Sequence, residues 1–278
     1  MLTAETITFE INNRKLVKDV TFNLCPGEMI AVLGANGAGK STMLKMLSGE
    51  LKPTSGSVSL NGKALSSYRP EVLARKRAVM NQQNSVNMDF LCSQIVLMGR
   101  YPHYKNKPAA ADLRIVTETL EVCGVGHLAE RAYFTLSGGE QQRVQLARVL
   151  AQVWDQPGAL ILMDEPVASM DLQYQQQTLA ILKALSRKNF MVIAILHEIN
   201  LAAQYADRII MLKNGRKWQD GSPVEVLKPN HIYTVFNVET EVHIHPATLN
   251  TNVIIGEVSL DAVNFNSFVT GGLQTING

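Results

Sequence analysis

Three short segments of the chain are apolar at every position, and they set the expected architecture. They are residues 29–33, 159–163 and 190–196. Uninterrupted apolar runs of this length are typical of strands in a parallel sheet that is buried on both faces. Helical patterns follow them at residues 41–47, 173–185 and 200–205. This repetition of strand and helix predicts an α/β fold.

The first residues show a different pattern. Residues 3–11 and 17–24 alternate partly between apolar and polar, and the turn cluster Asn12, Asn13 and Arg14 separates them. Alternation over this length indicates strands with one exposed face, and a short turn favours antiparallel pairing. We therefore expect an antiparallel β layer before the parallel core.

The middle of the chain is predicted to be mostly helical. Residues 94–99, 109–123 and 140–154 lack strand patterns, and in the last segment apolar side chains recur at three- and four-residue steps. A helical insert over about residues 84–156 accounts for this. After residue 237 two short strand-like pieces return, at 241–245 and 252–255, and the polar, glycine-bearing end at 271–278 is expected to be mobile. The pattern divides the chain into a main domain, 1–236, and an extension, 237–278.

Composition excludes several classes of protein. The 278 residues carry a formal net charge of +2, without the basic stripe of a nucleic-acid-binding protein. The three cysteines lie far apart and lack the CxxC spacing of a metal site. The first residues do not resemble a secretory signal, and no apolar run approaches the roughly 20 residues that span a bilayer. We expect a soluble chain that reaches a membrane only through a partner.

The most specific motif follows the apolar segment 29–33 and opens a helix. It matches the phosphate-binding pattern GxxxxGK[ST]. Its glycines allow backbone N–H groups to surround phosphate oxygens, and the helix N-terminus adds a positive dipole end. Lys40 is expected to reach the β- and γ-phosphates, and the Ser41 hydroxyl to ligate Mg²⁺. The candidate phosphate-binding residues are Gly34, Asn36, Gly37, Ala38, Gly39, Lys40, Ser41 and Thr42.

A pair of acidic residues ends the second apolar segment. Asp164 and Glu165 come directly after residues 160–163, where the sheets of α/β proteins bind ligands. Asp164 is a candidate Mg²⁺ ligand, and Glu165 is a candidate general base that polarises the attacking water. The pair taken alone is also compatible with an ordinary charged turn.

Residues 136–143 read LSGGEQQR, which resembles the signature sequence of the ABC ATPase family. Ser137, Gly138 and Gly139 offer a hydroxyl and bare N–H groups at a helix N-terminus, which suits an anion. In that family the anion is the γ-phosphate of ATP bound to the other subunit. Ser137 followed three residues later by Glu140 is also a capping box, and both roles are compatible.

Further positions match the family in the expected order. Gln82 resembles the Q-loop glutamine, although the adjacent Gln83 allows a shift of one residue; Asp171 resembles the D-loop aspartate, and His197 the switch histidine that contacts the γ-phosphate. A histidine at a strand end is more often structural. Here His197 directly follows the apolar segment 190–196, the next predicted core strand after the one that ends in Asp164 and Glu165, and this position favours a functional role. Together the motifs cover about residues 3–233.

The resemblance implies a P-loop ATPase with a RecA-like parallel core, an antiparallel β subdomain and a helical subdomain. It implies ATP and Mg²⁺ as ligands, with Ser41, Gln82 and Asp164 at the metal and Glu165, His197 and Gln82 in catalysis. The partners implied are a second copy in a head-to-tail homodimer, membrane permease subunits at the cytoplasmic face of the inner membrane and, indirectly, a substrate-binding protein. Nucleic acid is not among them. Where relatives stack an aromatic side chain on adenine, spacing places Ile11, with Phe9 nearby.

The solute class is suggested by shorter stretches. Residues 98–103, MGRYPH, resemble importers of iron-siderophore complexes, haem and cobalamin, and residues 143–152 and 242–246 most resemble haem-importing ATPases. The function expected is therefore ATP-driven haem uptake, with a ferric-siderophore or cobalamin importer as the alternative. A soluble ABC ATPase, such as an Fe–S assembly factor, is a further alternative of another class.

Overall fold

The computed structural model describes residues 1–81, 89–168 and 170–257. Its central element is a six-stranded sheet in the order β10-β9-β3-β8-β7-β6, in which only β10 runs antiparallel to its neighbour. Every side chain of β3, β7 and β8 is buried, which confirms the three predicted core strands. The strands are β3 (Met29–Leu33), β6 (Arg77–Met80), β7 (Leu160–Asp164), β8 (Met191–Ile195), β9 (Arg208–Lys213) and β10 (Arg216–Gly221).

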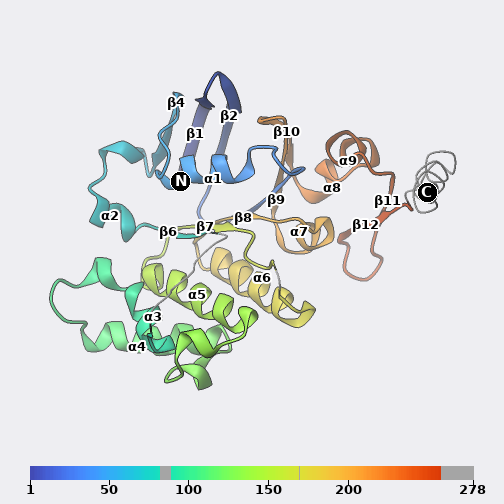
Figure 1. Ribbon diagram of the computed structural model, residues 1–278. Helices are drawn as coiled ribbons and strands as arrows, with labels where there is room; N and C mark the ends of the chain where they lie inside the picture. Colours follow the sequence, from blue (N-terminus) through green and yellow to red (C-terminus); the bar gives the residue numbers. More distant parts are fainter. Residues whose placement is uncertain (82–88, 169, 258–278) are drawn as a thin grey trace, which may run out of the picture.

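A four-stranded antiparallel sheet, in the order β2-β1-β4-β5, lies on one side of the central sheet (Figure 1). The predicted β layer is confirmed, but two of its strands come after α1 and carry no clear sequence pattern. The strands are β1 (Leu2–Ile11), β2 (Arg14–Leu24), β4 (Ser55–Leu60) and β5 (Lys63–Ala64).

The central sheet separates two apolar cores. Met29, Ala31 and Leu33 of β3 belong to the core shared with the helical layer. Ile30 and Val32 point the other way, into the core shared with α1 and the antiparallel sheet. Because successive side chains of a strand face opposite sides, a strand buried on both faces must be apolar throughout. The doubly buried strands therefore define the positions of the described residues that directly follow β3 and β7 at the carboxyl end of the sheet.

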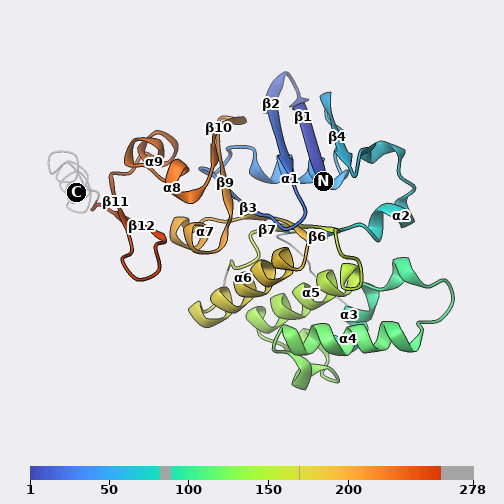
Figure 2. The same cartoon turned by 180° about the vertical axis from the view of Figure 1, so that it is seen from behind.

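The helices fall into groups on the two sides of this sheet. Figure 1 shows α1 on the side of the antiparallel sheet and α5 and α6 on the opposite side; in Figure 2, α3, α4 and α5 form the outer helical layer. The helices are α1 (Lys40–Ser48), α2 (Pro70–Ala74), α3 (Cys92–Met98), α4 (Ala110–Val122), α5 (Gly138–Val153), α6 (Leu172–Arg187), α7 (Ile199–Tyr205), α8 (Pro223–Val226) and α9 (Pro229–Phe236). In the parts of the chain that are described, no helix is long and apolar enough to cross a membrane.

Arg100 ties the helical layer together. Its buried guanidinium donates to Asp112 of α4 at 2.9 Å and to Asp155 at 2.9 Å, and also to the Ala151 carbonyl at the end of α5. A buried charge is tolerated when paired in this way. The stretch 98–103, which suggested the solute class, thus includes a structural arginine. The boundaries proposed for the insert stay a prediction.

The C-terminal extension forms an antiparallel hairpin of β11 (Thr240–Ile244) and β12 (Thr251–Ile255). It docks on α7, because the Asn200 amide both donates to the Val253 carbonyl at 3.0 Å and accepts from its N–H at 2.8 Å. The expected strands are confirmed, whereas the end at 271–278 lies outside the described residues.

Candidate functional site

The phosphate-binding loop connects β3 to α1 and leaves no room for side chains at two of its glycines. A Cβ on Gly39 would lie 2.4 Å from the carbonyl oxygen of Leu16, and its φ of 99° is itself unfavourable for other residues. A Cβ on Gly34 would lie 2.6 Å from the carbonyl oxygen of Leu212. The glycine spacing of the motif therefore follows from close backbone packing within this chain.

Lys40 is folded beneath the loop. Its Nζ donates to the carbonyls of Gly34 at 2.7 Å and Ala35 at 3.1 Å, and the residue is only 6% exposed. Burial lowers the pKa of Lys40, while the neighbouring Glu165 and Asp164 act in the opposite direction. The ammonium group is thus already desolvated and positioned at the loop, ready to exchange carbonyl oxygens for phosphate oxygens.

Ser41 and Asp164 face each other across the end of the sheet. The Ser41 hydroxyl donates to Asp164 Oδ1 at 3.3 Å, and Asp164 is the buried last residue of β7. Burial raises the pKa of Asp164, the Ser41 hydrogen bond lowers it, and Glu165 raises it further. A buried carboxylate with incomplete compensation is well suited to accept a cation.

Glu165 and His197 are paired at the carboxyl end of the central sheet. His197 Nε2 lies 2.6 Å from Glu165 Oε1. His197 comes two residues after the end of β8, which pairs with β7 in the sheet. Glu165 has a φ of 54°, a conformation that costs a non-glycine residue roughly 1–3 kcal/mol and is concentrated at functional sites. When Glu165 is ionised it can only accept, so Nε2 carries the proton between them.

Lys40, Ser41, Glu165 and His197 line one cleft of about 540 Å³, and the Ser41 hydrogen bond joins Asp164 to this lining. The sequence pattern brought most of its lining together correctly, but it missed Arg14 and Leu16, which enter from β2. The lining residues are Arg14, Leu16, Asn36, Gly37, Ala38, Gly39, Lys40, Ser41, Thr42, Glu165 and His197. The sequence signal that could have pointed to Arg14 is its position directly after Asn12 and Asn13, at the turn between the first two strands.

The structure differs from the expectation for the adenine-stacking position. Ile11 is 51% exposed and Phe9 packs against the core beneath the antiparallel sheet. Neither side chain lines the cleft, whose edge on this side is formed by Arg14 and Leu16. Which residue contacts the nucleotide base therefore stays a prediction.

The signature sequence forms the predicted capping box at the start of α5. The Ser137 backbone N–H and hydroxyl both donate to Glu140 Oε2 at 2.8 Å. These hydrogen bonds lower the pKa of Glu140. A Cβ on Gly138 or Gly139 would meet no atom within 4 Å, and residues 137–139 do not line the cleft. The N-terminus of α5 is therefore fully formed within one chain, but it does not line the cleft at the phosphate-binding loop of that chain.

Two contacts that the sequence did not reveal connect α5 to the loop after Glu165 and to α6. Gln142 Nε2 donates to the Pro166 carbonyl at 3.0 Å, and the Arg143 guanidinium lies 3.5 Å from the ring centre of Tyr174 on α6. The first of these contacts joins α5 to the residue that follows Glu165.

Two predicted site residues stand apart from this cleft. Asp171 precedes α6 without a side-chain capping hydrogen bond and does not line the cleft. Gln82 lies outside the described residues. Among the described residues, no three His, Cys, Asp or Glu side chains gather into a metal site. The hydroxyl and carboxylate oxygens of Ser41 and Asp164 nevertheless suit Mg²⁺, which is commonly held by one or two protein oxygens together with substrate phosphates and water.

Comparison with known proteins identifies the family. The family described as "ABC transporter" matches residues 17–168. Proteins named "Hemin import ATP-binding protein HmuV" are similar: that of Gloeobacter violaceus is 47% identical over 88% of this chain and 90% of its own, and that of Pseudomonas aeruginosa is 42% identical over 88% and 96%.

Solved structures agree in fold. A chain from a transporter described as metal-chelate type, in an inward-facing conformation, has a TM-score of 0.78 at 26% identity and covers 92% of this chain and 97% of its own. An ATP-binding cassette in a dimeric post-hydrolysis state, bound to ADP and phosphate, has a TM-score of 0.70 at 26% identity over 80% and 99%. The chain therefore belongs to the ABC transporter family, among its ATP-binding subunits.

Proposed function

We propose that this chain is the ATP-hydrolysing subunit of an ABC importer that takes up hemin through a partner permease. The observation that carries the ATPase assignment is a cleft lined by Lys40, Ser41, Glu165 and His197, in which the Ser41 hydroxyl is hydrogen-bonded to Asp164. The relatives named for hemin import, which match over most of the chain, support the choice of hemin.

The phosphate-binding loop would hold the triphosphate of ATP. Backbone N–H groups at the start of α1 point to its oxygens, and Lys40 exchanges its two carbonyl partners for the β- and γ-phosphates. Ser41 and Asp164 would hold Mg²⁺, with Gln82 as a further ligand. The ion, when bound, neutralises charge that develops on the phosphate oxygens.

Glu165 and His197 would act on the terminal phosphate. Glu165 accepts a proton from the attacking water while the water oxygen bonds to the γ-phosphorus. The bond between the γ-phosphorus and the bridging oxygen breaks, and ADP leaves with its electrons. His197, which carries its proton on Nε2, turns from Glu165 to donate to the γ-phosphate. Gln82 completes this set of catalytic residues.

The working unit would be a head-to-tail homodimer. Residues 137–139 end in open space away from the cleft of their own chain, as expected if they complete the site of a second copy. Asp171 would lie at the same interface. Related cassettes solved as dimers support this arrangement.

The remaining partners follow from the importer assignment. The segment 82–108, of which the structure describes residues 89–108, would receive a helix of the permease, so that this subunit lies peripherally on the cytoplasmic face of the membrane. A substrate-binding protein would deliver hemin to the permease from the other side. Arg100 would hold this segment to the helical layer through its pairs with the buried Asp112 and the partly exposed Asp155.

Substitution of Glu165 by glutamine tests the mechanism. Glu165→Gln keeps the size of the side chain but removes the base, so ATP hydrolysis by the purified transporter should fall by about 10²–10⁴-fold while ATP affinity is retained. Glu71→Gln, at an exposed position on α2, is the matched control and should hydrolyse ATP normally. Near-normal turnover by Glu165→Gln would exclude Glu165 as the base.

The solute is tested separately by reconstitution. The chain should co-purify with permease subunits from detergent-solubilised membranes, and liposomes containing the complex should take up hemin only when ATP is enclosed. Uptake of a ferric siderophore or of cobalamin in place of hemin would correct the solute but keep the importer. Isolation with a soluble Fe–S scaffold and no permease would overturn the transport function.

A further inference from the structure

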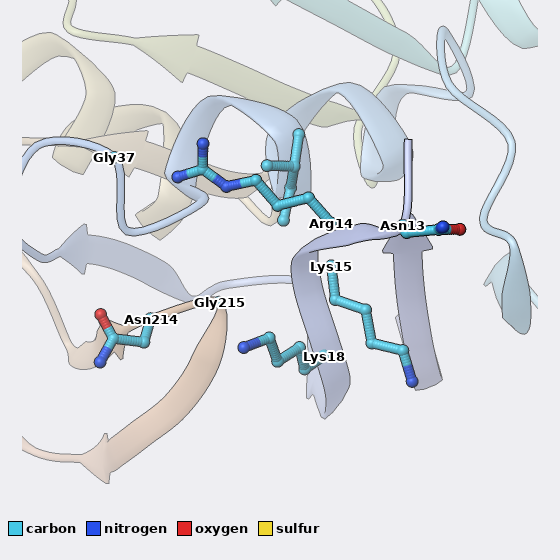
Figure 3. Close-up of a pocket in the computed structure, with 8 residues that line it drawn as sticks. Asn13, Arg14, Lys15, Lys18, Gly37, Asn214 and Gly215 are labelled. Carbon is cyan, nitrogen blue, oxygen red and sulfur yellow. The ribbon is translucent and has the colours of Figure 1, made fainter. Parts of the chain in front are cut away.

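A second pocket adjoins the cleft of the phosphate-binding loop. Arg14, Leu16 and Gly37 line both spaces, so the two lie side by side. The second pocket has a volume of about 600 Å³ and lies between the start of β2 and the β9–β10 turn (Figure 3). Its lining residues are Asn13, Arg14, Lys15, Leu16, Lys18, Gly37, Asn214 and Gly215. A nucleotide whose phosphates occupy the loop would extend its base towards this pocket.

The described lining of both spaces contains no aromatic side chain. A nucleotide base is flat and apolar on its faces, and binding sites usually offer such a face a stacking partner. Phe9 is packed into the core and Ile11 lies outside both pockets, so neither provides this partner. The stacking surface must come from another kind of residue.

Arg14 has the geometry and the freedom to provide it. Its side chain extends from the start of β2 towards the loop at Gly37, whereas Lys15 points away (Figure 3). Among the described residues, none forms a hydrogen bond or ion pair with the Arg14 guanidinium, unlike Arg208 and Arg216, which pair with carboxylates. A planar guanidinium stacks on π systems, and an ammonium group lacks that plane.

We propose that the Arg14 guanidinium stacks on the base of the bound nucleotide, with Leu16 beneath, and that the site therefore discriminates weakly between adenine and guanine. The proposal rests on the proposed function, because it assumes a triphosphate in the loop. Stacking uses a face that every base possesses. Discrimination needs fixed donors and acceptors at the base edge, and the side-chain amides nearby, such as Asn214, offer both a donor and an acceptor.

Competition binding to the full chain tests this with ATP, GTP and inorganic tripolyphosphate, each with Mg²⁺. The unmodified chain should bind ATP and GTP within about threefold of each other, and Arg14→Ala should weaken both by about tenfold without changing tripolyphosphate binding. Arg14→Lys should lose as much as Arg14→Ala, because it keeps the charge but not the plane. Arg14→Trp should restore the affinity. Arg69→Ala, at an exposed arginine preceding α2, is the control and should bind all three normally.

Several results would overturn the proposal. The first two are unchanged nucleotide binding by Arg14→Ala and full affinity in Arg14→Lys. The third is an equal loss of tripolyphosphate binding in Arg14→Ala, which would place Arg14 at the phosphates. The fourth is a preference for ATP over GTP above tenfold in the unmodified chain. Each of these leaves the ATPase assignment standing. Failure of the unmodified chain to bind any of the three ligands would instead overturn the nucleotide site itself.

Discussion

The two glycine-bearing helix ends, at the starts of α1 and α5, look alike in sequence but differ in what surrounds them. At the phosphate-binding loop, added Cβ atoms would meet backbone oxygens at 2.6 Å for Gly34 and 2.4 Å for Gly39. At the signature, added Cβ atoms on Gly138 and Gly139 would meet nothing within 4 Å. One set of glycines is required by the packing of the chain itself, and the other is not.

This difference indicates where each set acts. A glycine inside a helix costs about 1 kcal/mol relative to alanine, and nothing within the described chain compensates for this at the start of α5. The compensation must come from something that approaches the bare helix end. A nucleotide on a second copy of the chain meets that requirement, because a helix N-terminus attracts an anion.

The carboxylates beside the two helix ends also differ. Burial raises the pKa of Asp164 beside α1, and the hydrogen bond from Ser41 does not fully offset this effect. Hydrogen bonds from Ser137 lower the pKa of Glu140, which caps α5 at the surface. The first carboxylate is held ready for a ligand, and the second stabilises the fold.

The largest expected effect comes from filling the phosphate-binding loop. Gly39→Ala combines an unfavourable φ of 99° with a contact of 2.4 Å to the Leu16 carbonyl. We expect the free energy of unfolding to fall by about 2–4 kcal/mol and ATP binding to be lost. Denaturant titration and nucleotide titration measure the two effects.

Gly37→Ala provides the matched control. Gly37 has a φ of 77° but open space around its Cβ position, so only backbone strain is introduced, about 1 kcal/mol or slightly more. Equal losses of stability in the two variants would show that the close approach to Leu16 is unimportant.

Mixed dimers test whether the signature acts across the interface. A dimer with Lys40→Ala in one chain and Ser137→Ala in the other should retain one intact site and about half of the activity, because a two-fold dimer contains two equivalent sites. The same two substitutions in one chain, paired with an unmodified chain, should damage both sites. If the two arrangements behave in the opposite way, the signature acts within its own chain.

Much of the fold could be predicted, because its core strands are apolar throughout. The segment 29–33 and the strands β8 and β7 beside it carry a pattern that is typical of doubly buried strands. The strands β4, β5 and β10 were missed because most of their side chains are exposed or half-buried. In addition, β5 and β10 lie at sheet edges, where a strand is specified by its partner rather than by its own pattern.

The catalytic and ligand roles of the site residues stay predictions, but their grouping in space can be compared with the structure. Lys40, Ser41, Asp164 and Glu165 could be grouped from two motifs, because each lies at the end of a buried strand or at the start of a helix. Arg14 could not, because its relation to the loop depends on how the irregular β1–β2 pair lies over α1. Contacts of this kind depend on tertiary packing, which spacing along a sequence does not contain.

The two carboxylates should shift stability in opposite directions. Because the folded chain holds the Asp164 proton more tightly than the unfolded chain, the free energy of unfolding falls as pH rises through the raised pKa of Asp164. Asp164→Asn should therefore raise the melting temperature at pH 7 without nucleotide by a few degrees, while abolishing Mg²⁺-dependent hydrolysis. Differential scanning calorimetry and an ATPase assay measure this.

Glu140→Gln is the counterpart. The contribution of Glu140 is present above its unfolded pKa of 4.5 and is lost as pH falls through its lowered folded pKa, so the substitution should lower the melting temperature at pH 7. A decrease in melting temperature for Asp164→Asn would show that Asp164 is compensated in the empty site after all.

The smallest change in stability, and the most specific test of the comparison, is Gly138→Ala. The added methyl group meets no atom of the chain, and alanine favours the helix, so the free energy of unfolding should rise by about 0.5–1 kcal/mol. ATP binding to the isolated chain should be unchanged, because residue 138 does not line the cleft. Hydrolysis by the assembled transporter should nevertheless fall, since the methyl group would stand between the helix end and the partner's γ-phosphate. A variant that is more stable, binds ATP normally and still hydrolyses it at the full rate would show that the bare helix end of α5 serves no ligand.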